Sequence, residues 1–240
     1  MPKTKPESKA ETVRQVVKYN FYQVDPLWRR LPDAERQAHR EEFDAAVAKF
    51  SGRIEVRPYS LVGLRAEVDF LLWLLGWTLE EMQEFSAAVN STGLGKYLKT
   101  AYSYLSLSRP SPYVDDHIHA DQEGRQKVIR PQSPDHPYLV VYPFVKTADW
   151  YQLPLEERQR MMNKHFEVGH KYPGVRNNTS YSFGIDDQEH VVAFDVSSID
   201  EFLELLMELR ESEARPFTER DTPIFTCISG ELEDVLAGLG

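Results

Sequence analysis

The chain has 240 residues, 41% of them apolar and 12% aromatic, which is enough to bury a core in one large domain or two small ones. The formal net charge of −10 argues against nucleic-acid binding over the whole surface, because affinity for phosphate needs clustered lysine and arginine. A single cysteine, Cys227, excludes a disulfide within the chain, and the polar N-terminus is unlike a signal peptide. The longest apolar run, Phe70–Trp77, is far below the roughly 20 residues of a membrane helix. We therefore expect a soluble cytoplasmic protein with a disordered tail over residues 1–12.

The first half of the chain, residues 13–107, alternates strand and helix patterns. In chain order, the periodicity predicts a strand over Val13–Tyr22, a helix over Asp33–Phe50, strands over Arg53–Tyr59 and Leu64–Leu74, a helix over Leu79–Val89 and a strand over Lys96–Ser106. Residues 108–137 are rich in proline, aspartate and histidine and predict a long connecting loop. Such a loop inside a compact chain is often functional.

Residues 138–240 repeat the same order of elements. The patterns predict a strand over Tyr138–Phe144, a helix over Pro154–Tyr172, a hairpin of Thr179–Phe183 and His190–Val196, a helix over Ile199–Ser212 and a strand over Pro223–Ile228. Ser198, with Glu201 three residues later, is typical of a capping box. The order β-α-β-β-α-β is the ferredoxin-like plan. We therefore predict an α+β fold in which two ferredoxin-like halves form a dimeric α+β barrel-type unit.

One histidine lies on the face of a predicted helix that should be buried. In the segment Pro154–Tyr172, His165 lies four residues after Met161 and three residues before Val168, so the three share one helix face. A core histidine with one hydrogen bond explains this position. A ligand to haem iron is the other explanation, because an apolar helix face can hold a neutral imidazole. The pattern alone leaves both interpretations open.

Tyr142 and Lys146 lie four residues apart in the predicted strand and so point to one face of it. They are either surface side chains or a redox-capable phenol beside an ammonium that holds a carboxylate. Elsewhere, His117 and His119 have a spacing compatible with a metal site but lack a second ligand cluster. Cys227, inside an apolar strand, is better explained as a buried inert thiol than as a nucleophile.

The stretch YPFVKTADWYQLPLEERQRMMNKH contains a YPxxK strand, a WYxLPxEER segment and a helix that reaches His165. The pattern continues through GHKYPGV, FGIDDQEHVVAF and MELRESEAR. These motifs resemble the signature of the chlorite dismutase-like superfamily, and specifically of its coproheme decarboxylases. The resemblance covers roughly Pro137 to the C-terminus and is only general across the first half. It implies two ferredoxin-like halves and a homopentamer.

The resemblance also implies roles for individual residues. His165 would be the proximal ligand of the haem iron, and Tyr142 would become a radical that abstracts hydrogen from a propionate. Trp150 would line the porphyrin pocket. Propionate carboxylates would be bound by Lys146 and by the less firmly aligned Arg130 and Arg215, and further nearby cations are Arg125 and Lys127.

The position opposite the proximal histidine separates the activities of this superfamily. Chlorite dismutases resemble one another in carrying an arginine thirteen residues beyond that histidine, where this chain has the neutral Asn178. Arg176 would reach the position only after a register slip. The distal histidine found in one branch of the decarboxylases aligns near Arg125. The neutral amide favours a decarboxylase and places Asn178 beside the substrate.

The function implied is oxidative decarboxylation of coproheme to haem b with hydrogen peroxide, a step of haem synthesis. The iron porphyrin is then both substrate and cofactor, and the protein supplies orientation and electrostatics. Two alternatives stay open. One is a chlorite dismutase or weak peroxidase, and the other is a non-enzymatic haem-binding protein of the same fold.

Overall fold

The computed structural model describes residues 14–113, 128–131 and 135–240. The predicted tail lies outside the described residues, as do His117, His119, Arg125 and Lys127. Within the described part of the chain, no helix is long and apolar enough to cross a membrane.

The first half contains every element predicted for it. These are β1 (Val16–Val24), α1 (Asp33–Ala48), β2 (Glu55–Ser60), β3 (Phe70–Gly76), α2 (Leu79–Asn90) and β4 (Leu98–Leu107), with 3-10 turns at Trp28–Arg30 and Gly95–Tyr97. The strands lie in the order β4-β1-β3-β2, and each neighbouring pair is antiparallel. The predicted start of β3 at Leu64 was wrong, because Gly63, at φ 75°, turns the chain there and the Leu64 N–H donates to the Leu61 carbonyl.

The second half contains the predicted elements and several short ones that were not predicted. In chain order they are β5 (Tyr138–Lys146), α3 (Ala148–Gln152), α4 (Leu155–Gly169), β6 (Val175–Asn177), β7 (Ser180–Tyr181), β8 (His190–Val196), α5 (Ile199–Arg210), a 3-10 turn (Arg215–Phe217), β9 (Thr218–Arg220), β10 (Phe225–Ser229) and α6 (Leu232–Ala237). The unpredicted α3, β6, β9 and α6 have only three to six residues each, which is too few for a periodic signal.

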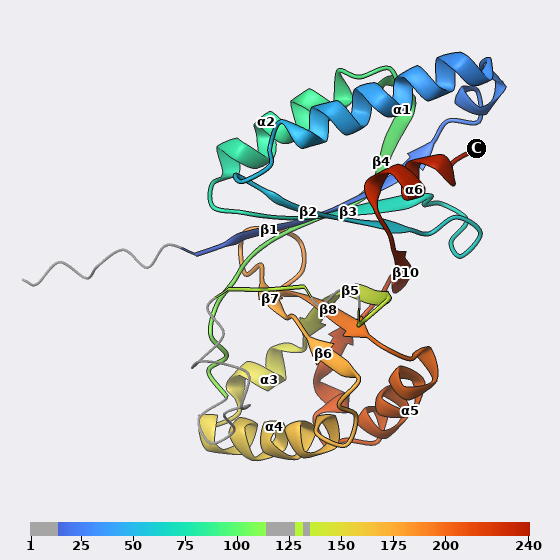
Figure 1. Ribbon diagram of the computed structural model, residues 1–240. Coiled ribbons are helices and arrows are strands. Elements are labelled where there is room, and N and C mark those ends of the chain that lie inside the picture. Colours follow the sequence, from blue (N-terminus) through green and yellow to red (C-terminus); the bar gives the residue numbers. More distant parts are fainter. Residues whose placement is uncertain (1–13, 114–127, 132–134) are drawn as a thin grey trace, which may run out of the picture.

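The strands of the two halves form one continuous ring. Strand β8 pairs with both β5 and β7, β7 pairs with β4, and β10 joins β5 to β2. Figure 1 shows α1 and α2 over the strands of the first half and α4 and α5 beneath those of the second. The molecule is therefore an α+β fold with two layers of strands between two layers of helices.

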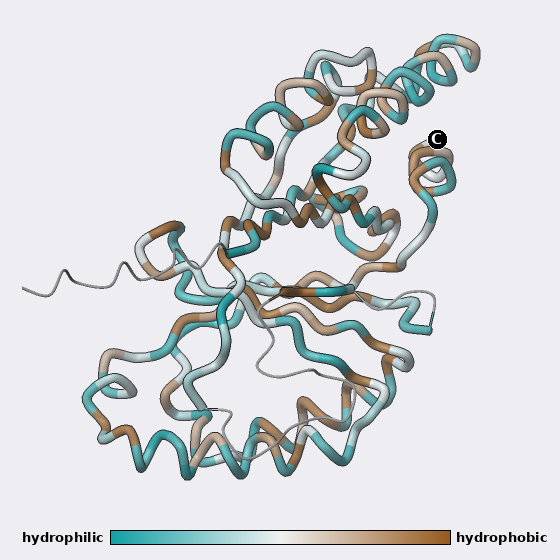
Figure 2. The backbone as a smooth tube through the Cα atoms, turned by 60° about the vertical axis from the view of Figure 1, so that its left-hand side comes forward, coloured by the Kyte–Doolittle hydropathy of each residue, from teal (hydrophilic) through white to brown (hydrophobic). Residues whose placement is uncertain are grey.

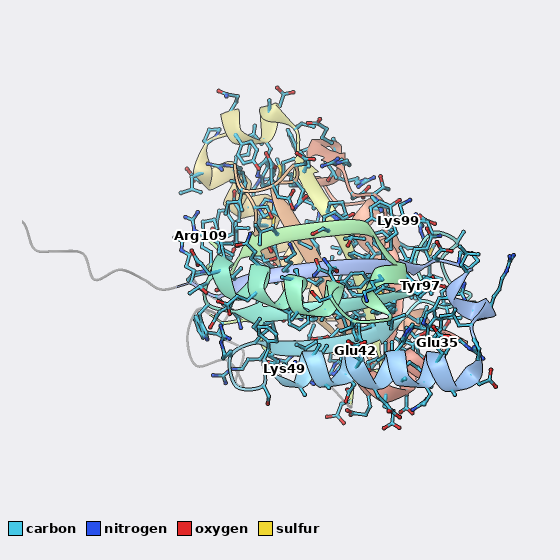
Figure 3. The ribbon with its side chains drawn as sticks, turned by 90° about the horizontal axis from the view of Figure 1, so that it is seen from above. Glu35, Glu42, Lys49, Tyr97, Lys99 and Arg109 are labelled. Carbon is cyan, nitrogen blue, oxygen red and sulfur yellow. The ribbon has the colours of Figure 1, made fainter. Side chains whose placement is uncertain are left out.

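Apolar side chains from both halves fill the space between the strand layers. They are Val17, Tyr19, Phe21, Tyr59, Leu61, Val68, Leu71, Trp73, Leu75, Tyr104, Ile129, Leu139, Val141, Val191, Ala193, Phe225 and Cys227. Figure 2 shows hydrophobic residues along the central strands, whereas the helices alternate between hydrophobic and hydrophilic residues. In the view of Figure 3, α1 and α2 lie side by side, and the exposed Glu35, Glu42 and Lys49 follow α1. Burial of the shared interior joins the two halves.

The C-terminal helix α6 returns to the first half. Val235, Leu236 and Leu239 are buried against side chains of α1, α2 and the first-half strands. The Leu239 carbonyl accepts a hydrogen bond from Arg29 Nε at 2.9 Å. The chain end is thus held by the layer opposite the one that carries β5 and α4.

Candidate functional site

The outer face of the second-half strands, which we call the Tyr142 face, carries Val140, Tyr142, Val192, Phe194 and Val196. Tyr142 is only 7% exposed and lies opposite Val192 in the β5–β8 ladder. Its ring centroid is 6.3 Å from that of Phe194. Burial and the charge of Asp221 raise the pKa of Tyr142 well above its usual value, and Arg210 and Arg215 partly offset this. Tyr142 is therefore a neutral phenol at pH 7.

Lys146 ends β5, and its Nζ lies 5.3 Å from the centroid of the Phe144 ring, which packs against the Tyr142 face. Its Nζ lies 4.3 Å from the centroid of the Trp150 ring and donates to the Ala214 carbonyl at 3.3 Å. Burial and the charge of Arg215 lower the pKa of Lys146 to about 8, although Glu189 acts in the opposite direction. The ammonium is partly desolvated and has donors left for an anion.

Trp150 is 2% exposed and is clustered with Met161 and Ala214 beneath the end of β5. Trp150 lies on the short helix α3, which ends at Gln152. Helix α4 begins at Leu155, directly after Pro154. Pro154 is placed before the first helical turn, where a missing N–H costs no hydrogen bond. This short connection brings α4 close to the Lys146 end of the strand.

His165 lies on α4 and is half-buried, as its apolar stripe predicts. Burial and the charge of Lys146 lower the pKa of His165 to about 4, so the imidazole is neutral at pH 7. Among the described residues, we find no hydrogen bond to this ring. A neutral imidazole with a free nitrogen is the form that binds a metal.

Two arginines and an aspartate form an ion-paired cluster whose charges act on Tyr142. Asp221 Oδ2 accepts hydrogen bonds from Arg215 at 2.6 Å and from Arg210 at 2.5 Å. Burial alone would raise the pKa of Asp221, but these hydrogen bonds outweigh burial and lower it. With Lys146, the group carries a net positive charge in a chain whose formal net charge is −10. We call Arg210, Arg215 and Asp221 the arginine pair and its aspartate.

His190 is a site residue that the sequence reasoning missed. It begins β8 opposite Phe144, so alternation places it on the Tyr142 face. Its ring centroid lies 4.9 Å from that of Phe183, 5.1 Å from that of Tyr181 and 6.1 Å from that of Phe144. Within the described part of the chain, its buried Nδ1 has no hydrogen-bond partner. Burial and the charge of Lys146 lower its pKa to about 4. The alternation of β8 was the available signal.

Asn178 does not lie on the Tyr142 face. It is 4% exposed, its N–H donates to the Ala193 carbonyl at 2.7 Å, and its Nδ2 donates to buried Asp195 at 2.8 Å. Because Ala193 faces the interior, alternation turns Asn178 inward. Arg176 pairs opposite Asp195 and has the same parity. Asn178 is therefore buried and hydrogen-bonded inside the molecule, in contrast to the predicted contact with the substrate.

The neighbours of Asn178 occupy the Tyr142 face instead. Asn177 pairs opposite Phe194, and Thr179 Oγ1 donates to Asn177 Oδ1 at 2.7 Å. Both side chains are neutral. The sequence predicts a neutral side chain rather than an arginine at this point of the strand. In the structure, the neutral side chains next to the Tyr142 face are Asn177 and Thr179 rather than Asn178.

Arg130 lines a different hollow. Its neighbours there include Gln15, Arg53, Arg57 and Trp77 of the first half. The adjoining Ile129 is fixed by Gln15, whose Oε1 accepts the Ile129 N–H at 2.8 Å.

Contacts join Lys146 to Trp150 and to the carbonyl of Ala214, the residue before Arg215. The charge of Arg215 acts on Tyr142, and that of Lys146 acts on His165. Arg130 lines the other hollow. No group of three or more potential metal ligands occurs within the described ranges.

The sequence of this chain matches those of known proteins. The family model for chlorite dismutase matches residues 36–230. A curated coproheme decarboxylase of Mycolicibacterium smegmatis is 34% identical over 182 residues, which is 75% of each chain. The chain belongs to the chlorite dismutase family.

Solved structures of the chlorite dismutase family agree with the fold. A mutant chlorite dismutase from Candidatus Nitrospira defluvii superposes with a TM-score of 0.85 at 25% identity, covering 94% of this chain and 95% of the other. A haem-binding protein from Thermus thermophilus gives a TM-score of 0.82 at 25% identity, covering 94% and 95%. The predicted superfamily is confirmed, and the α+β fold matches that of the chlorite dismutases.

Proposed function

We propose that this protein decarboxylates coproheme to haem b with hydrogen peroxide. The proposal is supported by a buried tyrosine, a group of cations and a neutral half-buried histidine in the second half of the chain, which are linked by the charges of Lys146 and Arg215. The tyrosine suits hydrogen abstraction, the cations suit carboxylates and the histidine suits iron. The similarity to a coproheme decarboxylase supports the same reaction.

The residues present fit an iron porphyrin. His165 offers a neutral imidazole to the iron, and Val192, Phe194 and Trp150 offer apolar surface to the ring. Lys146 and Arg215 offer donors to the peripheral carboxylates. Bound here, the iron porphyrin would supply the oxidising chemistry with peroxide, and the protein would supply position and charge.

Tyr142 is proposed to transfer hydrogen. After losing a hydrogen atom, its phenoxyl radical takes one from the β-carbon of a propionate and returns to the phenol. The carboxyl group leaves as carbon dioxide, and a vinyl group remains. Overall, one propionate carboxylate, one peroxide and one proton give the vinyl group, carbon dioxide and two waters, with two electrons passing from the propionate to the peroxide. The neutral phenol favours this role, because the hydrogen is present at pH 7.

The neutral side chains on β6 and after it favour decarboxylation over chlorite chemistry. Asn177 and Thr179 offer no positive charge to an anionic chlorine–oxygen species. Chlorite dismutase activity is the alternative, because the fold superposes on one of those enzymes with a TM-score of 0.85. A haem-binding protein without this chemistry is the other alternative.

We also propose that each half is a ferredoxin-like unit. The strand order β4-β1-β3-β2 of the first half supports this, as does the corresponding order of β10, β5, β8 and β7 in the second. The domain limits 13–107 and 138–240, a homopentamer and a cytoplasmic location stay predictions that follow from composition and resemblance.

The proposal is tested by adding coproheme and hydrogen peroxide to the purified protein and following the porphyrin by mass. We expect stepwise loss of two carboxyl groups, with a three-propionate species appearing before haem b. Chlorite-dependent oxygen release without decarboxylation would identify a chlorite dismutase. Binding of haem b with no conversion of coproheme would identify a carrier.

A further inference from the structure

His190 is a diagonal neighbour of Tyr142 on the Tyr142 face. In the β5–β8 ladder, Tyr142 lies opposite Val192, and His190, two residues earlier on β8, lies opposite Phe144. Diagonal neighbours on one face of an antiparallel pair have β-carbons roughly 7 Å apart. On the other side of β8, Tyr181 of β7 lies opposite His190. The imidazole therefore belongs to the surface around the proposed hydrogen-transfer residue.

Aromatic rings enclose one side of this imidazole. The rings of Phe144, Tyr181 and Phe183 surround it, and we find no hydrogen bond to either of its nitrogens within the described ranges. Buried polar side-chain atoms normally have a hydrogen-bond partner, so the buried Nδ1 of His190 is an exception that needs an explanation. Because Nδ1 is enclosed, Nε2 is the nitrogen left to reach a bound molecule.

His190 and His165 belong to opposite layers of the second half. Helix α4, which carries His165, lies beneath the strands (Figure 1), and the Tyr142 face is turned to this helix layer, because Phe202 of α5 packs against it. Met161 of α4 packs with Trp150 instead. A planar ring held by His165 therefore has the strand face, with His190 on it, on its other side.

His190 is also the neutral nitrogen base of this face. The outer faces of β5 to β8, all of them described in the structure, otherwise carry aliphatic, aromatic and amide side chains. Lys146, which ends β5, has a pKa of about 8 and is already protonated at pH 7. The pKa of His190, lowered to about 4 by burial and the charge of Lys146, leaves its imidazole free to accept a proton.

We propose that Nε2 of His190 is the acid–base group that activates hydrogen peroxide on the strand side of the bound porphyrin. It takes a proton from the peroxide oxygen next to the iron and returns it to the other oxygen, which leaves as water when the O–O bond breaks. The iron porphyrin supplies the two electrons that this cleavage consumes. The imidazole ends the step in its starting form. This inference deepens the proposed function and rests on it.

Cyanide binding tests the role of His190 without turnover. Hydrogen cyanide has to lose its proton when it binds ferric iron, whereas nitric oxide binds without proton transfer. We expect His190→Phe, which keeps an aromatic ring at this position, to slow cyanide association with the coproheme-loaded protein by about 100-fold at pH 7. Nitric oxide association should change by less than about twofold, because it needs no base. Stopped-flow absorbance measures both rates.

Two further variants sharpen the result. His136→Phe is the matched control, because His136 also has a buried Nδ1 without a partner among the described residues and a pKa lowered by burial. It precedes β5 at the end remote from Phe144, so both rates should stay unchanged. His190→Gln keeps a polar side chain but has no basic nitrogen, and it should slow cyanide association as much as His190→Phe.

An unchanged cyanide rate in His190→Phe, or equal slowing of cyanide and nitric oxide, would overturn the inference. A wild-type cyanide rate in His190→Gln would do the same, because the imidazole would then act only as a hydrogen-bonding group, and so would an equal effect of His136→Phe. A wild-type protein that does not bind coproheme would overturn the proposed function as well. Normal coproheme binding with any of the other results overturns only the role of His190.

Discussion

Tyr142 shows how one strand position combines burial and charge. Alternation along β5 turns it to the outer face with Val140, and the ladder places Val192 opposite. The phenol is buried among apolar groups, yet the charges of Asp221 and its two arginines act on it. The residue types were evident from the sequence, whereas the neighbouring charges come from a segment almost eighty residues later.

Replacing Tyr142 with phenylalanine tests the hydrogen-transfer role. We expect Tyr142→Phe to lower decarboxylation by at least about 100-fold, because the abstracting oxygen is gone, while coproheme still binds. Tyr138→Phe is the matched control, since Tyr138 lies on the same strand and packs on the same face. Product formation measured by mass decides the outcome. Undiminished decarboxylation in Tyr142→Phe would rule the mechanism out.

Lys146 should make carboxylate binding depend on pH. Its pKa of about 8 means that the ammonium is charged at pH 7 and largely lost by pH 9. Affinity for coproporphyrin should therefore fall as pH rises through 8, by up to about tenfold, although the bound anion moves the midpoint upward. Lys146→Met should bind more weakly at pH 7 and show a flat profile. Lys18→Met, which removes a half-buried lysine of lowered pKa in the first half, should leave the wild-type profile unchanged. A flat wild-type profile would contradict this role.

The start of α5 illustrates what short motifs determine at the scale of an element. Ser198 accepts the Glu201 N–H at 3.4 Å, so the predicted cap is confirmed. The reciprocal half of the capping box is absent, because the Glu201 carboxylate accepts the Gly174 N–H at 3.0 Å. A β-carbon on Gly174 would lie 2.2 Å from Glu201 Oε2, so a larger residue there would displace the carboxylate. Glu201 thus makes a hydrogen bond to a distant segment instead of the bond to the Ser198 N–H that a full capping box contains.

Removing the cap should weaken α5 by a modest amount. We expect Ser198→Ala to lower the free energy of unfolding by about 1 kcal/mol, because one N–H at the start of the helix loses its acceptor. Thr78→Ala, which removes the equivalent cap of α2, should cost a similar amount. Urea denaturation measures both. An unchanged stability in Ser198→Ala would show that the 3.4 Å contact contributes nothing.

At the scale of the whole molecule, the ring of strands closes an interior to which both halves contribute. Cys227 is fully buried there, and burial raises the pKa of its thiol well above the usual value. The predicted inert thiol agrees with this position. The closure also explains why neither half has an exposed apolar inner face.

The reactivity of Cys227 should therefore show whether the ring of strands opens in the native protein. We expect a water-soluble thiol reagent to leave the native protein unlabelled over hours and to label one thiol per chain in urea, because only unfolding exposes the thiolate. Absorbance of the released reagent gives the rate. Rapid labelling of the native chain at full stoichiometry would show that the interior opens without unfolding.

The sequence by itself determined the principal elements, the face of β5 that carries Tyr142, and the position of His165 on α4. These depend on periods of two and 3.6 residues, which are local properties. Only the tertiary structure decided that Asn177 rather than Asn178 lies next to the Tyr142 face, that Arg130 lies elsewhere, and that Arg210 and Asp221 join Arg215. Those outcomes depend on strand register and on contacts between segments far apart in the chain, which local periodicity does not encode.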